Sequence, residues 1–253
     1  MPIILDTSAD GFAARFETFL GSKREASEDV DAVAREILRA VEARGDEALI
    51  GYSKKFDRVD LTPQTIRISA QEIDAAFEMA DQKTVAALQF AKDRIESHHR
   101  KQLPQDQRYT DPLGVELGYR WSALESVGIY VPGGKAAYPS SVLMNAVPAV
   151  VAGVPRIAMC VPAPDGAINP LVLIAAKLAG VTEIYRVGGA QAIAALAHGT
   201  QTIAPVAKIV GPGNAYVAAA KRLVVGRVGI DMVAGPSEVL VIADGYANPD
   251  WIA

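Results

Sequence analysis

The chain has 253 residues, half of them hydrophobic, and a formal net charge of −4 from 25 basic and 29 acidic residues. No segment concentrates Lys and Arg enough for nucleic-acid binding, and Gly and Pro interrupt the apolar runs well short of a membrane span. The single cysteine excludes an internal disulfide, and the N-terminus lacks a signal-peptide pattern, so we expect a soluble cytoplasmic protein.

The first third of the sequence predicts helices. Apolar residues recur at four-residue spacing within residues 29–44, and Gly45 follows as a stop signal. Ser69 and Glu72 have the spacing of a capping box and predict the start of a second helix. A third helix is expected over residues 82–103, between an acidic N-cap and a proline.

Two short strands are expected in the same part of the chain. Residues 66–68, with Ile66 and Ile68 on either side of Arg67, could form a short strand between two predicted helices. In residues 115–121 apolar and other side chains alternate, as is typical of a half-buried strand.

From residue 127 onward the pattern of strand, glycine-rich loop and helix repeats. The predicted strands are residues 127–131, 156–161, 183–187, 207–210 and 239–243. The predicted helices are residues 140–152, 170–179, 190–198 and 214–225, and Pro148 is expected to end or kink the first of them. Units of this length indicate right-handed βαβ crossovers and a parallel sheet, so the fold class is α/β.

The last residues have the features of a helix start. Asn248 is a good N-cap, Pro249 suits the first helical position, and Asp250 lies in the first turn. The chain ends about one turn into this helix, after nucleation but before much propagation. We therefore expect a truncated domain.

Glycine-rich loops follow three of the predicted strands and open predicted helices. Such loops present backbone N–H groups at the positive end of a helix and can hold a phosphate. None is a full dinucleotide fingerprint, because Tyr216 stands where the third glycine would be in the last loop, and each alone is an ordinary turn. Together at one edge of a sheet they favour a nucleotide site. The loops are Pro132-Gly133-Gly134, Gly188-Gly189-Ala190 and Gly211-Pro212-Gly213-Asn214.

The polar side chains at these loops are Tyr130, Lys135, Gln191 and Asn214. Gln191 and Asn214 could cap their helices, and Tyr130 could be a core aromatic with its hydroxyl at the rim. The alternative is that they touch a ligand, and spacing does not decide between the two. The same holds for Ser237, which could satisfy backbone groups in a Gly-Pro turn or bind substrate beside the nucleotide.

Metal ligands are scarce in the sequence. His98 and His99 are adjacent, so they do not share a helix face and are interpreted as surface residues. His198 lies near a helix end, where it can interact with the dipole. Cys160 lies in an apolar strand and is interpreted as a buried small hydrophobe.

The same segments, in this order, resemble histidinol dehydrogenase. The matching runs are VGIYVPGG (127–134), YPSSVLMN (138–145), VGGAQAIAAL (187–196), VGPGNAYV (210–217) and IDMVAGPSE (230–238). The resemblance extends over the whole chain and is weaker in the helical first third.

The resemblance implies an NAD-dependent, two-step oxidation of L-histidinol through histidinaldehyde to L-histidine, in histidine biosynthesis. It implies that Tyr130, Gln191 and Asn214 contact NAD and that Ser237 contacts the substrate. Members of the family are homodimers that use zinc to hold the substrate and a Glu–His pair for proton transfer.

In the family the zinc ligands and the Glu–His pair come later than residue 253, so the resemblance implies no catalytic or metal-binding residue in this chain. We expect it to be inactive alone and to bind NAD weakly at best; the alternatives are a non-catalytic nucleotide-binding module or a remnant without a ligand. The implied domains are an N-terminal arm (1–25), an incomplete α/β domain (26–129 plus 236–253) and, inserted in it, a Rossmann-like NAD-binding domain (130–235).

Overall fold

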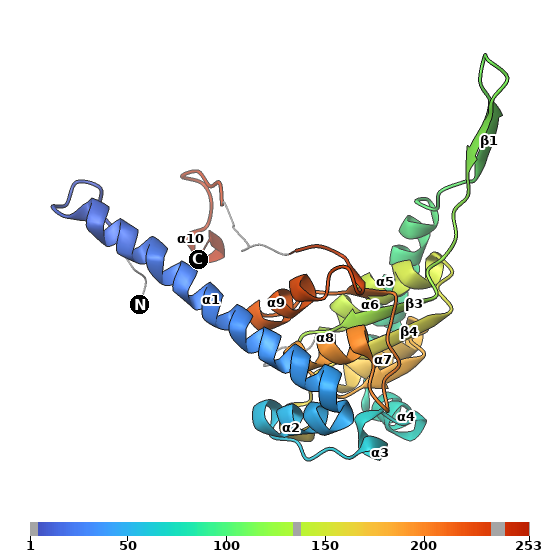
Figure 1. Ribbon diagram of the computed structural model, residues 1–253, viewed down its shortest axis with the longest axis horizontal. Helices are drawn as coiled ribbons and strands as arrows, with labels where there is room; N and C mark the ends of the chain where they lie inside the picture. The colour runs from blue at the N-terminus through green and yellow to red at the C-terminus, as the bar shows by residue number, and fades with distance from the viewer. Residues whose placement is uncertain (1–4, 134–137, 234–240, 253) are drawn as a thin grey trace.

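The computed structural model describes residues 5–133, 138–233 and 241–252, and in these residues the centre of the fold is a five-stranded parallel sheet (Figure 1). Its strand order is β5-β4-β3-β6-β7. The strands are β3 (Ser126–Tyr130), β4 (Arg156–Cys160), β5 (Glu183–Tyr185), β6 (Lys208–Val210) and β7 (Gly229–Ile230).

A helix makes each crossover between these strands. They are α6 (Pro139–Val151), α7 (Pro170–Leu178), α8 (Gly189–His198) and α9 (Ala215–Leu223), and a 3-10 turn, η1 (Pro164–Gly166), follows β4. The repeated strand–helix units confirm the predicted α/β, Rossmann-like fold class. The chain moves outward from β3 to β5 and then returns to the other side of β3, so the strand order reverses between β3 and β6. In such sheets ligands bind at this switch point, outside the carboxyl ends of the strands.

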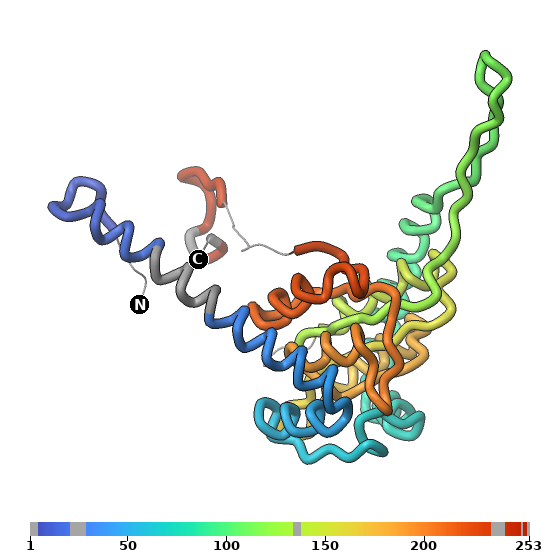
Figure 2. Tube along the Cα trace, viewed as in Figure 1, coloured from blue at the N-terminus to red at the C-terminus, as the bar shows by residue number. Residues whose placement is uncertain are grey.

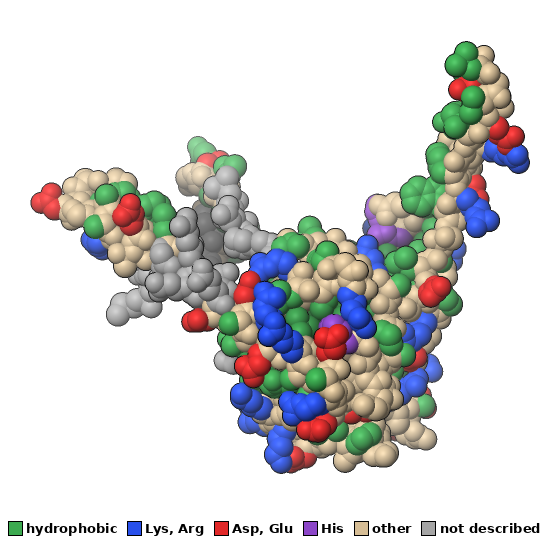
Figure 3. All heavy atoms as spheres, viewed as in Figure 1, with side chains coloured by type: hydrophobic (Ala, Val, Ile, Leu, Met, Phe, Trp, Pro, Cys, Tyr) green, Lys and Arg blue, Asp and Glu red, His purple; other side chains and the backbone are tan. Residues whose placement is uncertain are grey.

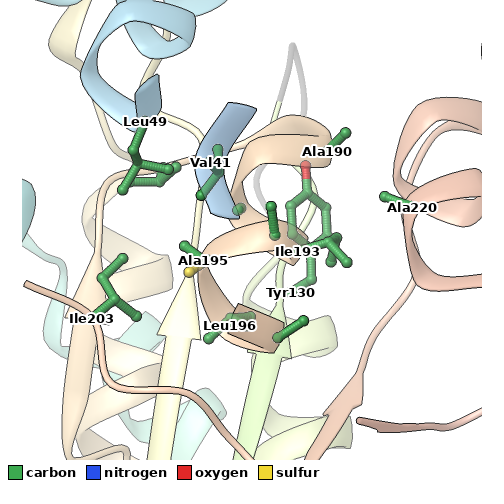
Figure 4. Close-up of a cluster of buried hydrophobic side chains, with 14 of the residues drawn as sticks. Val41, Leu49, Tyr130, Ala190, Ile193, Ala195, Leu196, Ile203 and Ala220 are labelled. Atoms are coloured by element: carbon green, nitrogen blue, oxygen red, sulfur yellow. The ribbon is translucent and has the colours of Figure 1, made fainter. Parts of the chain in front are cut away.

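Side chains alternate between the two faces of the sheet and build one core on each. Tyr130 and Cys160 belong to the core under α8, whereas Ile129 and Met159 belong to the core under α6 and α7. Figure 4 shows the first of these cores, in which alanines of α8 let the helix lie close to the strands. At Gly128 an added Cβ would meet the methyl groups of Leu196 at 3.0 Å, which explains a glycine inside a buried strand.

The N-terminal part contributes α1 (Phe12–Arg44), α2 (Asp46–Asp57), α3 (Pro63–Ile66), α4 (Ala70–Met79) and α5 (Gln82–Arg100). The expected end of the first helix is confirmed: Gly45 has φ +57° and its N–H donates to the Val41 carbonyl at 2.8 Å. The capping box is confirmed too, with Ser69 N–H donating to Glu72 Oε2 at 2.9 Å and Glu72 N–H to Ser69 Oγ at 3.2 Å.

The expected start of α1 at residue 29 is wrong, because the helix begins at Phe12. Its C-terminal half packs on α8 and α9 and carries the predicted apolar spacing. Its first turns lie away from the sheet, as the tube in Figure 2 shows, and their apolar residues Phe16 and Leu20 are each 40% exposed.

The predicted strand at residues 66–68 is reduced to a single bridge. Ile66 ends α3, which Thr62 and Pro63 start with a capping box and a proline at the first position. Arg67 then forms an isolated antiparallel bridge with Tyr185, and Ile68 N–H donates to the Ile184 carbonyl at 2.9 Å. The segment therefore extends one edge of the sheet without becoming a strand.

The strand expected within residues 115–121 exists but is not half-buried. It is β2 (Glu116–Tyr119), which pairs with β1 (Gln107–Thr110) in an antiparallel hairpin whose strand residues are all exposed. The hairpin extends from the body, and Figure 3 shows hydrophobic side chains on its surface. Alternation in the sequence does not reveal whether a second layer covers the apolar face, and no described segment does so here.

Pro148 does not end α6, which continues to Val151. Proline removes one N–H donor from the helix, but Val147 and Ala149 on either side are buried, and their packing favours continuation. At the end of the chain α10 (Pro249–Ile252) confirms the predicted helix start, with Asp250 N–H donating to Asn248 Oδ1 at 3.0 Å. Of the strand predicted at 239–243, the first two residues lie outside the described residues and the rest form no strand.

Candidate functional site

A cavity of about 520 Å³ lies where the sheet ends at β3 and meets the first turn of α8. The structure brings Tyr130, Gln191 and Asn214 together in its wall, from the end of β3, the first turn of α8 and the N-cap of α9. Whether they contact a cofactor stays a prediction. The other lining residues are Val33, Ile37, Phe56, Asp57, Pro132, Gly133, Pro162, Pro164, Gly189, Ala190 and Tyr216.

Tyr130 ends the central strand and is almost fully buried. Its hydroxyl accepts a hydrogen bond from the Gly189 N–H at 3.1 Å, and Figure 4 shows the ring directed toward the start of α8. Burial raises the pKa of Tyr130 to about 12, so the hydroxyl keeps its proton at neutral pH. It holds the α8 loop in place and retains a donor.

Gln191 lies in the first turn of α8 and is completely buried. Neither its Oε1 nor its Nε2 has a hydrogen-bond partner among the described residues. The capping interpretation is therefore wrong for Gln191, since its amide satisfies no helix end and none of the described side chains caps α8. A buried amide without partners costs about 1–3 kcal/mol, and a polar ligand in the cavity would remove that cost.

Gly189 makes room for this amide. It has φ +65°, which favours glycine, and an added Cβ would lie 2.6 Å from Gln191 Oε1. The first turn of α8 thus presents backbone and an unpaired amide to the cavity.

Asn214 caps α9, with Oδ1 accepting from the Val217 N–H at 3.0 Å. The capping interpretation is confirmed for this residue. Because the acceptor oxygen caps the helix, the amide nitrogen still offers donors to a ligand.

The loop before α9 is fixed by an ion pair whose lysine is buried. Gly211 has φ +114°, and an added Cβ would overlap the carbonyl oxygen of Tyr130. Lys221, buried on α9, donates to the Gly211 carbonyl at 2.9 Å and pairs with Asp231, which in turn accepts from the Gly211 N–H at 2.9 Å. The sequence did not single out Lys221; its position four residues after buried Val217, on the same helix face, is the one local signal.

Asp57 also lines the cavity, and sequence reasoning missed it. It is the last residue of α2, is 9% exposed, and its Oδ2 has no hydrogen-bond partner in the described part of the chain. Burial raises the pKa of its carboxyl group above the ordinary value.

The histidines and the cysteine considered in the sequence do not line this cavity. His98 is exposed and His99 partly exposed on α5, and His198 Nδ1 lies 3.2 Å from Glu42 Oε1. Cys160 is fully buried, and burial raises its pKa to about 12, which confirms the interpretation as a small core residue. Lys135 and Ser237 lie outside the described residues.

Among residues 5–133, 138–233 and 241–252 no group of three His, Cys, Asp or Glu side chains is arranged to hold a metal ion. In the same residues no helix has both the length and the apolar composition needed to cross a membrane.

Comparison with known proteins gives one consistent family. A family profile described as histidinol dehydrogenase matches residues 21–253. The chain is 68% identical over 253 residues to histidinol dehydrogenase of Bradyrhizobium diazoefficiens, which covers 100% of this chain and 59% of that protein. It is 69% identical over 242 residues to the one of Brucella abortus, covering 96% of this chain and 56% of that protein.

A crystal structure of histidinol dehydrogenase from Elizabethkingia anophelis is similar in fold. It aligns with a TM-score of 0.81 at 43% identity, over 87% of this chain and 51% of that one. The chain thus spans somewhat more than half the length of the relatives it matches. On these comparisons, the chain belongs to the histidinol dehydrogenase family.

Proposed function

We propose that this chain supplies the NAD-binding part of an oxidoreductase that converts L-histidinol, through histidinaldehyde, to L-histidine. The observation that carries the proposal is the fully buried, unpaired amide of Gln191 in a cavity at the switch point of the sheet. Tyr130 and Asn214, which the family resemblance assigns to the cofactor, line the same cavity. Residues 130–235 are proposed as the NAD-binding domain, although the central strand begins earlier, at Ser126.

The residues of the cavity suit the parts of a dinucleotide. The amide of Gln191 can both donate to and accept from the ligand. The N-terminus of α8, which no side chain in the described part of the chain caps, offers backbone N–H groups and a positive dipole end to a pyrophosphate. Val33, Ile37 and the prolines of the wall supply apolar surface that excludes water.

Within this proposal the chain's own residues bind and orient the cofactor. NAD, when bound, accepts a hydride from the carbon that is oxidised. Tyr130 stays protonated because of its burial and can hold the cofactor through its hydroxyl.

Zinc does not fit the described residues, because no group of three ligating side chains exists among them. The homodimer, the cytoplasmic location and the substrate contact of Ser237 stay predictions. A non-catalytic nucleotide-binding module would use the same cavity, and it differs from the main proposal only in lacking substrate turnover.

Replacing Gln191 by leucine tests the cofactor site. Gln191→Leu keeps the side-chain volume but removes the amide, so we expect the affinity for NAD to fall about 10- to 100-fold. The thermal midpoint without nucleotide should rise, since an apolar side chain replaces an unpaired polar one. Isothermal titration calorimetry measures the first effect and thermal unfolding the second. Gln102→Leu, at an exposed position, is the control that should leave NAD binding unchanged.

Failure of the unmodified chain to bind NAD would sink the cofactor proposal and leave the remnant interpretation. Equal NAD affinity of Gln191→Leu and the unmodified chain would show that NAD does not bind to the Gln191 amide.

The chain alone should not oxidise L-histidinol. The family resemblance places the zinc ligands and the proton-transfer pair outside these residues, and hydride transfer requires both substrate orientation and proton removal. We expect no NADH formation above background when the chain is mixed with NAD, L-histidinol and zinc, followed at the absorbance of NADH. Sustained turnover by the purified chain would contradict this assignment.

A further inference from the structure

Asp57 is a buried acid with an unpaired carboxylate oxygen. It is 9% exposed, and its Oδ2 has no hydrogen-bond partner among the described residues. It belongs to α2, whereas the other polar groups of the cavity come from β3, α8 and the loop before α9. The carboxylate therefore reaches the cavity from a separate part of the chain.

Several physical effects oppose a charge at this position. Burial disfavours the ionised form, and the nearby charge of Arg58 offsets this only in part. Asp57 ends α2, where the helix dipole is negative and repels an acid. Arg58 forms its ion pair with Asp165 instead, to which its Nε and Nη2 donate, each at 2.7 Å. A residue kept against such costs points to a ligand.

The chemistry of the surrounding wall narrows the ligand. A carboxylate only accepts hydrogen bonds, so its natural partners are hydroxyl or N–H donors. Among the described lining residues Asp57 is the only charged side chain, and none is basic, so this side of the cavity does not suit a phosphate. Phe56, Val33 and Ile37, which line the same cavity, provide an apolar surface of the kind on which a base packs.

A nucleoside meets these requirements, with the base on the apolar wall and the ribose diol on the carboxylate. The phosphates would then face the glycine loop at the N-terminus of α8. Uncharged adenine suits an apolar wall better than the cationic nicotinamide ring of NAD⁺ does.

We propose that Asp57 accepts hydrogen bonds from the hydroxyls of the adenosine ribose and thereby selects NAD over a dinucleotide with a 2′-phosphate. The inference rests on the proposed NAD site and adds its specificity residue. A carboxylate that binds a ribose diol would repel a phosphate in the same place, because both are negative.

The test compares Asp57→Asn with the unmodified chain, using NAD, NADP and AMP as calorimetric probes. The unmodified chain should bind NADP at least about tenfold more weakly than NAD. Asp57→Asn should lose about 10- to 100-fold in affinity for both NAD and AMP, and the gap between NAD and NADP should narrow. Asp60→Asn is the matched control: it makes the same charge change at an exposed acid nearby and should behave as the unmodified chain does.

Thermal unfolding without nucleotide distinguishes a ligand-binding role from a structural one. If Asp57 binds a ligand, its replacement should raise the thermal midpoint; if Asp57 supports the fold, its replacement should lower it. Because the folded-state pKa of Asp57 is raised, its ionisation opposes folding at neutral pH, and this penalty vanishes as the pH falls below the unfolded-state value. Asp57→Asn should therefore raise the thermal midpoint at pH 7 and lose that advantage near pH 3. A lower midpoint at pH 7 would assign Asp57 to the fold and overturn the inference.

The outcomes separate the two proposals. Unchanged NAD affinity in Asp57→Asn, or weaker NAD binding with unchanged AMP binding, would overturn the role of Asp57 at the adenosine ribose while leaving the NAD site intact. Binding of none of the three probes by the unmodified chain would overturn both.

Discussion

Gly211→Ala is expected to destabilise the chain by about 3–5 kcal/mol, a large part of the roughly 5–15 kcal/mol that keeps a typical domain folded. Gly211 has φ +114°, a conformation that costs an L-residue about 1–3 kcal/mol. An added Cβ would also overlap the carbonyl oxygen of Tyr130, so one of two backbone segments must move. Urea unfolding followed by circular dichroism measures the loss, and NAD binding should disappear with it.

Gly226→Ala separates the cost of backbone strain from the cost of the steric overlap with Tyr130. Gly226 has a similar φ of +97°, but an added Cβ there would meet no atom within 4 Å. This control should show the backbone strain alone, about 1–3 kcal/mol. If the two variants were equally destabilised, the close approach of the Gly211 loop to Tyr130 would not be the reason for glycine.

The sheet and its crossover helices could be predicted because the local sequence patterns for strands, turns and helices agree with one another there. Apolar strands of the right length are followed by glycine loops and then by helices, and nothing outside the unit has to be known. The start of α1 and the exposure of β2 could not be predicted in the same way. Both depend on what packs against the element, and a periodic pattern does not report whether its apolar face is covered.

In the candidate site, too, some residues can be found from local sequence patterns and one cannot. Tyr130, Gln191 and Asn214 lie next to glycine loops, so the logic of strand ends and helix N-termini finds them. Asp57 is an acid at the end of an ordinary amphipathic helix and becomes unusual only when α2 is placed against the cavity. A burial cost of this kind arises from the tertiary structure, and the sequence alone does not contain it.

Lys221→Met is the second change with a large expected effect. Lys221 is buried, and removing it leaves the Asp231 carboxylate and the Gly211 carbonyl without their shared donor. Breaking a buried pair from one side costs about 3–5 kcal/mol, and we expect about 2–4 kcal/mol because Asp231 is about one-third exposed. Lys177→Met, in the last turn of α7, is the matched control: its exposed side chain should cost little.

The pH dependence of this variant identifies the ion pair as the cause. Burial acts to raise the pKa of Asp231, but hydrogen bonds from Lys221 and from the Gly211 and Met232 backbone outweigh it, so the net pKa lies below its ordinary value. A lowered folded-state pKa contributes stability that is complete above the unfolded-state pKa, about 4, and is lost as the pH falls through the folded-state value.

The difference in unfolding free energy between the unmodified chain and Lys221→Met should therefore shrink from pH 6 to pH 3. The double variant Lys221→Met with Asp231→Asn should recover part of the loss at neutral pH, because no uncompensated charge remains. A difference that stayed constant over this pH range, with no recovery in the double variant, would mean that Lys221 acts through packing of its aliphatic stem alone. The Gly211 loop would then owe its conformation to the glycine and not to the ion pair beneath it.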